Sequence, residues 1–333
     1  MQTPSEKTGK LLLTTEEELF AHIIDAKHPF RRVNEIIDFE TVTAPMRATY
    51  STLGAHGIDV RKGVKALLIQ FWEDYSDRQM EQAVRENIAV RWFCGFSLTE
   101  TTPDYSYFSK LRTRIGAKRI ADMFKEVNAT LESQGLFGNV FTFIDASTII
   151  TKTALWEERD RALKDGETKL NNTNVSDYAA DKDARWGAKS ESNIWFGHKR
   201  HTAVDMRHGL VRNVAVTAAN LPDFKAAERI MPKQGAVFMD KGYDYKEVER
   251  AALARGCHAS IIRKNNNKEK NHDLDRYRSG IRMPFEGTFS KMTKRARYRG
   301  HAKVTMQAFF QALVHNLKKA VAVLVAPPCP LPA

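Results

Sequence analysis

Apolar residues recur at helical spacing through the first 135 residues of the chain. Residues 14–18 (TTEEE) place a capping threonine and three acids ahead of Leu19 and Phe20, which is typical of a helix start. Residues 76–79 (SDRQ) form a capping-box pattern directly after the strongly apolar segment 63–75. The pattern predicts an all-α region with helices near residues 14–24, 28–39, 63–75, 76–84, 106–115 and 117–133.

The periodicity changes at residue 140, where short apolar runs and alternating segments begin. Residues 195–205 and 210–217 predict a hairpin around His208 and Gly209, whereas residues 151–193 are polar and follow no period. The remaining elements expected are strands at 140–150, 237–240 and 258–262 and helices at 223–231 and 245–255. This order predicts an α/β fold, a ribonuclease H-like mixed sheet flanked by helices and preceded by the all-α module.

Three carboxylates stand at boundaries of these predicted elements. Asp145 and Asp240 end strand-like apolar runs, and ligands bind at strand ends in α/β sheets. Glu286 follows Pro284 and is expected to open a helix that faces the two strand ends. Each acid alone has an ordinary explanation as a solvated strand end or a first-turn acid. Together, in this order, they predict a site for two Mg²⁺ ions, with Mn²⁺ able to substitute and Asp145 bridging both ions.

The charge of the chain indicates what such a site would act on. The formal net charge is +12 at pH 7, and the stretch from Lys291 to Lys319 holds eight basic residues and no acid. A strongly basic protein favours a polyanionic partner, so a nucleic acid phosphodiester is the expected substrate.

Other classes of site and of location are not supported. Three cysteines without Cys-x-x-Cys spacing argue against a disulfide framework and a zinc ribbon. His198, His201, His208 and Cys257 lack metal-ligand spacing, so structural or DNA-facing roles are favoured over zinc. No signal core, membrane-spanning run or Gly-rich phosphate loop is found, so we expect a cytoplasmic protein that uses neither a membrane nor ATP.

The sequence resembles the DDE transposases of bacterial insertion sequences, in the group named after insertion sequence five. The matching segments are 68–81 (LIQFWEDYSDRQME), 102–106 (TPDYS), 143–147 (FIDAS), 197–201 (GHKRH), 220–223 (NLPD), 240–243 (DKGY), 285–289 (FEGTF) and 316–319 (NLKK). The resemblance implies that Asp145, Asp240 and Glu286 are the metal-binding triad. Arg282 matches the family's arginine, whereas Ser279 and Thr293 stand where the family has Tyr and Lys.

Basic residues near the triad are predicted to contact DNA. If a helix continues beyond Glu286, Arg297 lies on the same face and Lys294 about 80° away, so either could replace the missing lysine beside Arg282. Lys241 adjoins Asp240. Lys199 and His201 share one face of the predicted strand, and the family match makes that face a plausible DNA contact.

Two further groups are candidate DNA contacts. The predicted helix at 106–115 carries Lys110, Arg112 and Arg114, which could read DNA as in a helix-turn-helix or form only a solvated face. Trp156, Trp186 and Trp195 border the long polar segment and could stack on an unpaired base, although core packing is the favoured role.

These observations predict a transposase with three regions. Residues 1–135 form a helical module for DNA-end binding and dimerisation, residues 136–322 the catalytic domain, and residues 323–333 an unstructured tail. The partners expected are double-stranded DNA, as terminal inverted repeats and as target, and further copies of the chain in a homodimer or larger synaptic complex. The alternatives are a nuclease of the same fold that cuts without joining and a non-catalytic, domesticated DNA-binding protein.

Overall fold

The computed structural model describes residues 15–50, 57–151, 175, 179–190, 193–290 and 292–325, and only the backbone at residues 286, 289, 290 and 325. The chain divides into two compact units, residues 1–111 and 112–333, and each is described by itself. The boundary expected at residue 135 stays a prediction. None of the helices in the described ranges is long and apolar enough to cross a membrane.

The first unit is helical, as the sequence predicts. Capping boxes start two of its helices, with Thr15 paired to Glu18 and Ser76 paired to Gln79. The second half of α4 is buried around its whole circumference, from residue 66 to residue 71, which explains why this part of its sequence lacks a polar stripe. The helices are α1 (Glu16–Ile23), α2 (Pro29–Ile36), α3 (Phe39–Arg47), α4 (Val60–Trp72), α5 (Asp77–Glu86), α6 (Ile88–Cys94) and the first part of α7 (Tyr105–Ser133).

The predicted break between helices at residue 116 is confirmed inside α7. Gly116 has φ 73° and ψ 162°, a conformation outside the helical region that glycine adopts without steric cost. The second part of α7 packs on the sheet of the second unit, where the Asn128 amide donates to the carbonyl oxygens of Val211 and Arg212.

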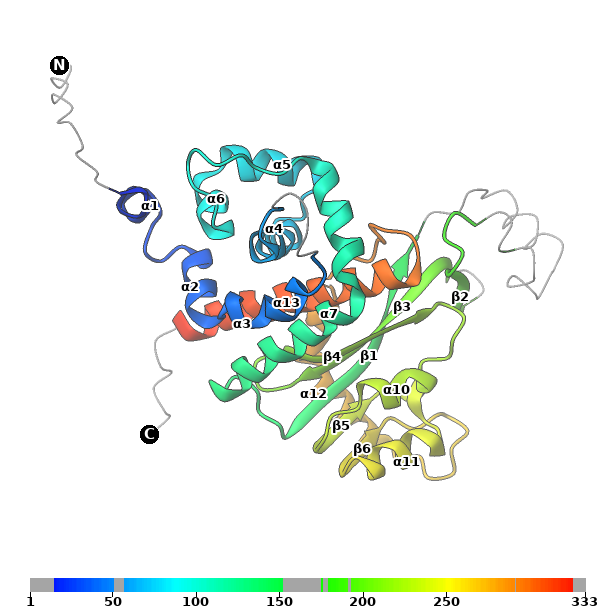
Figure 1. Ribbon diagram of the computed structural model, residues 1–333. Helices are drawn as coiled ribbons and strands as arrows, with labels where there is room; N and C mark the ends of the chain where they lie inside the picture. Colours follow the sequence, from blue (N-terminus) through cyan, green and yellow to red (C-terminus); the bar gives the residue numbers. More distant parts are fainter. Residues whose placement is uncertain are drawn as a thin grey trace, which may run out of the picture. The chain divides into compact units, whose positions relative to one another are not determined.

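The second unit is built on a six-stranded mixed sheet (Figure 1). The predicted hairpin forms as β3 and β4 in antiparallel pairing, and β1 pairs antiparallel with β3 and parallel with β5. β6 pairs parallel with β5, and β2 pairs antiparallel with β3. The strands are β1 (Phe141–Ile150), β2 (Arg185–Ser190), β3 (Asn193–Asp205), β4 (Leu210–Ala218), β5 (Gly235–Met239) and β6 (Cys257–Ile261).

Helices cover both faces of this sheet, which confirms the predicted mixed sheet flanked by helices. α10 (Phe224–Ile230) and α11 (Lys246–Ala254) bury Ile144, Ala203 and Val237 on one face. On the other face, α12 (His272–Ser290) lays Arg282 over the Phe143 ring, and α13 (His301–Val325) bonds to Arg200 through Gln311. Side chains alternate along β1, so Asp145 shares the α12 face with Phe143.

Two expectations about secondary structure are wrong. β2 lies inside residues 151–193, which showed no period, and its backbone bonds come from the long neighbouring strand β3. The helix expected to open after Pro284 instead begins at His272 and ends at Ser290. Beyond it, Ile150 exchanges backbone hydrogen bonds with Lys294 and Ala296, so this segment is extended rather than helical. α13 reaches Val325, and residues 326–333 of the expected tail lie outside the described part.

Candidate active site

Asp145 and Asp240 lie side by side on adjacent strands, at the carboxyl end of β5. In the parallel pairing of β1 with β5, Ile144 stands opposite Met239, so the next residue on each strand is one of the two aspartates. Asp145 lies inside the central strand β1 rather than at its end, whereas Asp240 is the first residue after β5. The parallel register therefore brings together two acids that are 95 positions apart in the sequence.

The turn after β5 fixes the direction of the Asp240 carboxylate. Asp240 caps the short 3-10 helix η1 (Lys241–Tyr243), and its Oδ1 accepts a hydrogen bond from the Gly242 N–H at 2.9 Å. A Cβ at residue 242 would stand 3.0 Å from that oxygen, so glycine lets the carboxylate come close to the backbone. Tyr243 is buried under the turn and anchors it.

Burial raises the pKa of Asp145 to about 6. The negative charge of Asp240 acts in the same direction, while the hydrogen bond from the Ala146 N–H and the positive charges of Arg282 and Lys189 lower the pKa. Two carboxylates with this mutual repulsion, in a half-buried position, form a site that favours a cation.

Arg282 and Glu286 belong to α12, which packs against β1. The Arg282 side chain is buried, with its guanidinium 4.7 Å from the centre of the Phe143 ring, two residues before Asp145 on the same face. Glu286 follows Arg282 by four residues, about one helical turn and 6 Å along the axis. Its backbone is therefore on the side of α12 that faces the aspartates, and its side chain lies outside the described part of the structure.

The donor set fits a hard divalent cation. Mg²⁺ prefers carboxylate oxygens and is commonly bound through one or two protein carboxylates. Asp145 and Asp240 supply two adjacent carboxylates. Among the side chains that the structure describes, no group of three or more His, Cys, Asp or Glu residues could hold a metal ion, and that search does not reach the Glu286 carboxylate.

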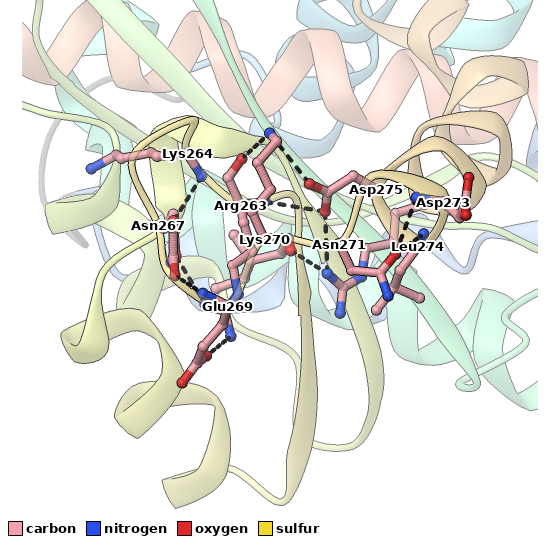
Figure 2. Close-up of polar contacts among 12 residues, drawn as sticks. Arg263, Lys264, Asn267, Glu269, Lys270, Asn271, Asp273, Leu274 and Asp275 are labelled. Atoms are coloured by element: carbon pink, nitrogen blue, oxygen red, sulfur yellow. Dashed lines mark hydrogen bonds and ion pairs between the residues drawn. The ribbon is translucent and has the colours of Figure 1, made fainter.

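A network of ion pairs and hydrogen bonds, here called the brace, ties the Asp240 turn to the start of α12 (Figure 2). Its members are Asp244, Arg263, Lys270 and Asp275. Asp244, four residues after Asp240, accepts from the Arg263 guanidinium at 2.9 Å. Asp275, in the first turn of α12, accepts from the Arg263 backbone N–H at 3.2 Å and lies 3.6 Å from the Lys270 ammonium. The brace thus links the two elements that carry Asp240 and Glu286.

The basic helix predicted at residues 106–115 is only partly exposed. Lys110 and Arg114 are at the surface, but Arg112 is only 4% exposed and lies over the Tyr298 ring at 4.6 Å. The expectation of three exposed cations is therefore wrong for Arg112. An arginine can bury its stem and stack its planar guanidinium on an aromatic ring, so its charge alone does not place it at the surface.

Lys199 and His201 share a strand face as predicted, but that face is buried. His201 has no exposed surface, its imidazole lies 2.8 Å from the Thr217 hydroxyl, and burial lowers its pKa to about 4. Lys199 forms an ion pair of 2.9 Å with Asp223 and donates to the Leu221 carbonyl oxygen. A DNA contact by His201 is thus contradicted, whereas Lys241, beside Asp240, is exposed.

The reason given for Lys294 and Arg297 is also wrong. Their predicted placement requires a helix that continues from Glu286, yet α12 ends at Ser290 and the backbone at residue 294 pairs with β1. Arg297 is half-buried and its N–H donates to the Gln307 side chain at 2.8 Å, while Lys294 is exposed. Lys294 remains a candidate DNA contact only through this exposure.

Two of the tryptophans, and two of the residues considered as zinc ligands, have structural contacts. Trp186 and Trp195 are both buried, which confirms core packing for these two residues, and Trp156 lies outside the described residues. His198 is fully buried and pairs with Asp181 at 3.1 Å, and the Cys257 thiol donates to the Pro232 carbonyl oxygen.

Sequence inspection missed Lys189 and the brace. Lys189 lies on β2, in the segment without a period, and only folding brings its charge near Asp145. The start of α12 did leave a local signal. The Asn271 side chain accepts from the N–H groups of Asp273 and Leu274, a cap that marks the true start of α12.

Comparison with known proteins identifies related sequences. Residues 18–114 match the family described as a transposase domain (DUF772), and residues 137–317 match the family described as a transposase DDE domain. The chain is 27% identical over 234 residues to the transposase for insertion sequence element IS1106 of Neisseria meningitidis serogroup B, covering 66% of this chain and 80% of that protein. A cryo-EM structure of the piggyBac transposase synaptic complex with hairpin DNA is similar at 8% identity and a TM-score of 0.35, over 96% of this chain and 84% of that one.

Proposed function

The chain belongs to the family of transposase DDE domains, a family of enzymes, and we propose that Asp145, Asp240 and Glu286 are its metal-binding triad. The observation that supports this proposal best is the parallel pairing that sets Asp145 beside Asp240. Burial and then the charge of Asp240 raise the pKa of Asp145. Such a shift is expected for two adjacent carboxylates whose repulsion a bound cation would relieve.

The proposed reaction has two phosphoryl-transfer steps. Water first cleaves a strand at the element end, and the freed 3′ hydroxyl then attacks target DNA. A Mg²⁺ pair, or Mn²⁺ in its place, would activate the nucleophile and stabilise the leaving oxygen. Asp145 and Asp240 would hold these ions together with Glu286, while the buried Arg282 supplies fixed positive charge beside Asp145.

The proposed partners follow from charge and from the reaction. A net charge of +12 favours binding of the DNA backbone, and Lys241 and Lys294 are exposed cations in the catalytic unit. The helical module at residues 1–135 would bind the terminal inverted repeats, with Lys110 and Arg114 as surface contacts. Joining two ends to one target requires two active sites, so a homodimer or larger synaptic complex is expected.

A joining assay distinguishes this proposal from a nuclease or a non-catalytic DNA-binding protein. Purified full-length protein would be mixed with a pre-cleaved element end carrying a free 3′ hydroxyl, supercoiled target plasmid and Mg²⁺. We expect covalent joining of the end to the plasmid, abolished by EDTA. Cleavage of uncut ends without joining would indicate a nuclease, and DNA binding with neither reaction would indicate a domesticated protein.

A further inference from the structure

The loop at residues 262–271 leaves the sheet at the same edge as Asp240. β6 runs parallel to β5 with Ile261 opposite Met239, and the Ile262 N–H donates to the Met239 carbonyl oxygen at 3.0 Å. The loop therefore begins beside the residue that precedes Asp240. Carboxyl ends of parallel strands are where open α/β sheets bind their ligands.

Two of the acids near this loop, Asp244 and Asp275, are turned inward by the brace. The Asp244 side chain is 5% exposed and accepts from the Lys264 backbone N–H at 2.8 Å and from the Asn267 amide at 2.9 Å. The Asp275 side chain is 9% exposed and accepts from the Arg263 backbone N–H. Both carboxylates thus accept hydrogen bonds from backbone N–H groups of the loop, and these bonds fix its backbone.

Hydrogen-bond donors and positive charges are left at the outer surface of the loop. Asn265, Asn266 and Lys268 are exposed. The Lys264 ammonium lies 3.4 Å from the centre of the Tyr245 ring, and its side chain extends away from the brace in Figure 2. Glu269 is exposed, and its carboxylate lies 3.4 Å from the Arg263 guanidinium, which also pairs with Asp244 and with Glu249 at 2.5 Å.

We propose that loop 262–271 is a DNA-backbone clamp of the catalytic edge, in which Lys264 and Lys268 contact phosphates and the brace holds them in place. The inference rests on the proposed function, because it assumes that the DNA strand to be cut lies against Asp240. Ammonium groups and side-chain amides are the donors that position DNA by its phosphates without reading its sequence. Asp244, Arg263 and Asp275 are positioning residues in this account.

The first test removes the two cations and measures DNA binding in EDTA, where no reaction takes place. The double variant Lys264→Gln, Lys268→Gln should bind end DNA and unrelated duplex more weakly by the same factor. The slope of log affinity against log salt should fall by about 1 per lost phosphate contact. The control Lys118→Gln, Lys125→Gln carries the same charge change on α7, where both lysines pair with Asp122, and should leave the slope unchanged.

Equal effects of the two double variants would overturn the clamp, because total charge alone would then explain the loss. Since the binding is measured without metal, its outcome does not depend on catalysis. A normal salt slope in the Lys264, Lys268 variant refutes the clamp even if the protein cleaves and joins DNA. A reduced slope supports the clamp even if the joining assay fails.

The second test separates positioning from charge. Asp244→Asn removes a negative charge, so electrostatics alone predicts tighter DNA binding. If the brace positions the clamp, the variant should instead bind more weakly, because the Lys264 N–H and the Arg263 guanidinium lose their anionic acceptor. Tighter binding would contradict the positioning role. Should this variant fail to fold, Asn267→Ala removes one hydrogen bond to Asp244 without any charge change. It should also weaken DNA binding, by a smaller factor.

Discussion

At the scale of single residues, the candidate metal site is defined by the positions of its carboxylates in the sheet. Asp145 and Asp240 were predictable because each ends an apolar run, and such a run marks a buried strand. The structure adds that the strands are parallel neighbours, which sets the two acids side by side and raises the pKa of Asp145 through burial and mutual repulsion. No local pattern contains that pairing.

Gly197 is predicted to be required for the pairing of β1 with β3. A Cβ at this position would lie 2.0 Å from the Ile149 carbonyl oxygen, and the residue has a φ of +153°. Gly197→Ala should lower the free energy of unfolding by roughly 3 kcal/mol or more, because backbone atoms of the strand bearing Asp145 cannot yield. Urea unfolding at 25 °C measures the change.

Gly280 offers the matched control for that substitution. It lies in α12 with nothing within 4 Å of an added Cβ, so Gly280→Ala should stabilise the protein by about 0.5–1 kcal/mol. A Gly197→Ala protein that unfolds at the same urea concentration as the wild type would show that the close approach of β3 to β1 is not as described.

Solvent exposure of basic residues was the least predictable property at this scale. Arg112 and His201 were expected at the surface because their segments alternate or follow a helical period. Whether a given face points to solvent depends on what packs against it, and Tyr298 and Thr217 come from distant parts of the sequence. The exposure of long amphipathic side chains is therefore harder to predict from a local pattern than the position of Asp145 or Asp240.

At the scale of elements, the strands with a clear pattern were predicted, whereas β2, the short helices α3 and α6 and the extent of α12 were not. Strands β1, β3 and β5 have apolar or alternating sequences, which are the local pattern of a strand. Proline is favoured at the first position of a helix, so Pro284 predicts a helix start, yet it lies inside a helix that begins at His272. The cap at Asn271 was the correct start signal.

Replacing Pro284 tests the extent of α12. Inside a helix, proline removes the hydrogen bond to the residue four positions earlier and costs about 3 kcal/mol relative to alanine. Pro284→Ala should therefore raise the thermal midpoint, measured by circular dichroism. An unchanged or lower midpoint is expected instead if a helix starts at this proline, and it would contradict the described α12.

At the scale of the whole molecule, the sequence indicated both the class of partner and the order of the two regions. A net charge of +12 and the order of predicted elements led to a DNA-processing α/β enzyme after a helical module, and the family match agrees. The brace could not be predicted, because its acids and its arginine come from the Asp240 turn, the loop after β6 and α12. Such networks exist only once the chain has folded.

The central claim is that Asp145 and Asp240, with Glu286, hold the catalytic metal ions. The most direct test measures Mg²⁺-dependent cleavage of end DNA by Asp145→Asn, Asp240→Asn and Glu286→Gln, with DNA binding measured in EDTA. Asp273→Asn, an exposed acid on α12, is the control and should keep its rate. We predict that each triad variant loses cleavage by a factor of about 10² or more while still binding DNA. Wild-type cleavage by Asp145→Asn or Asp240→Asn would contradict the account.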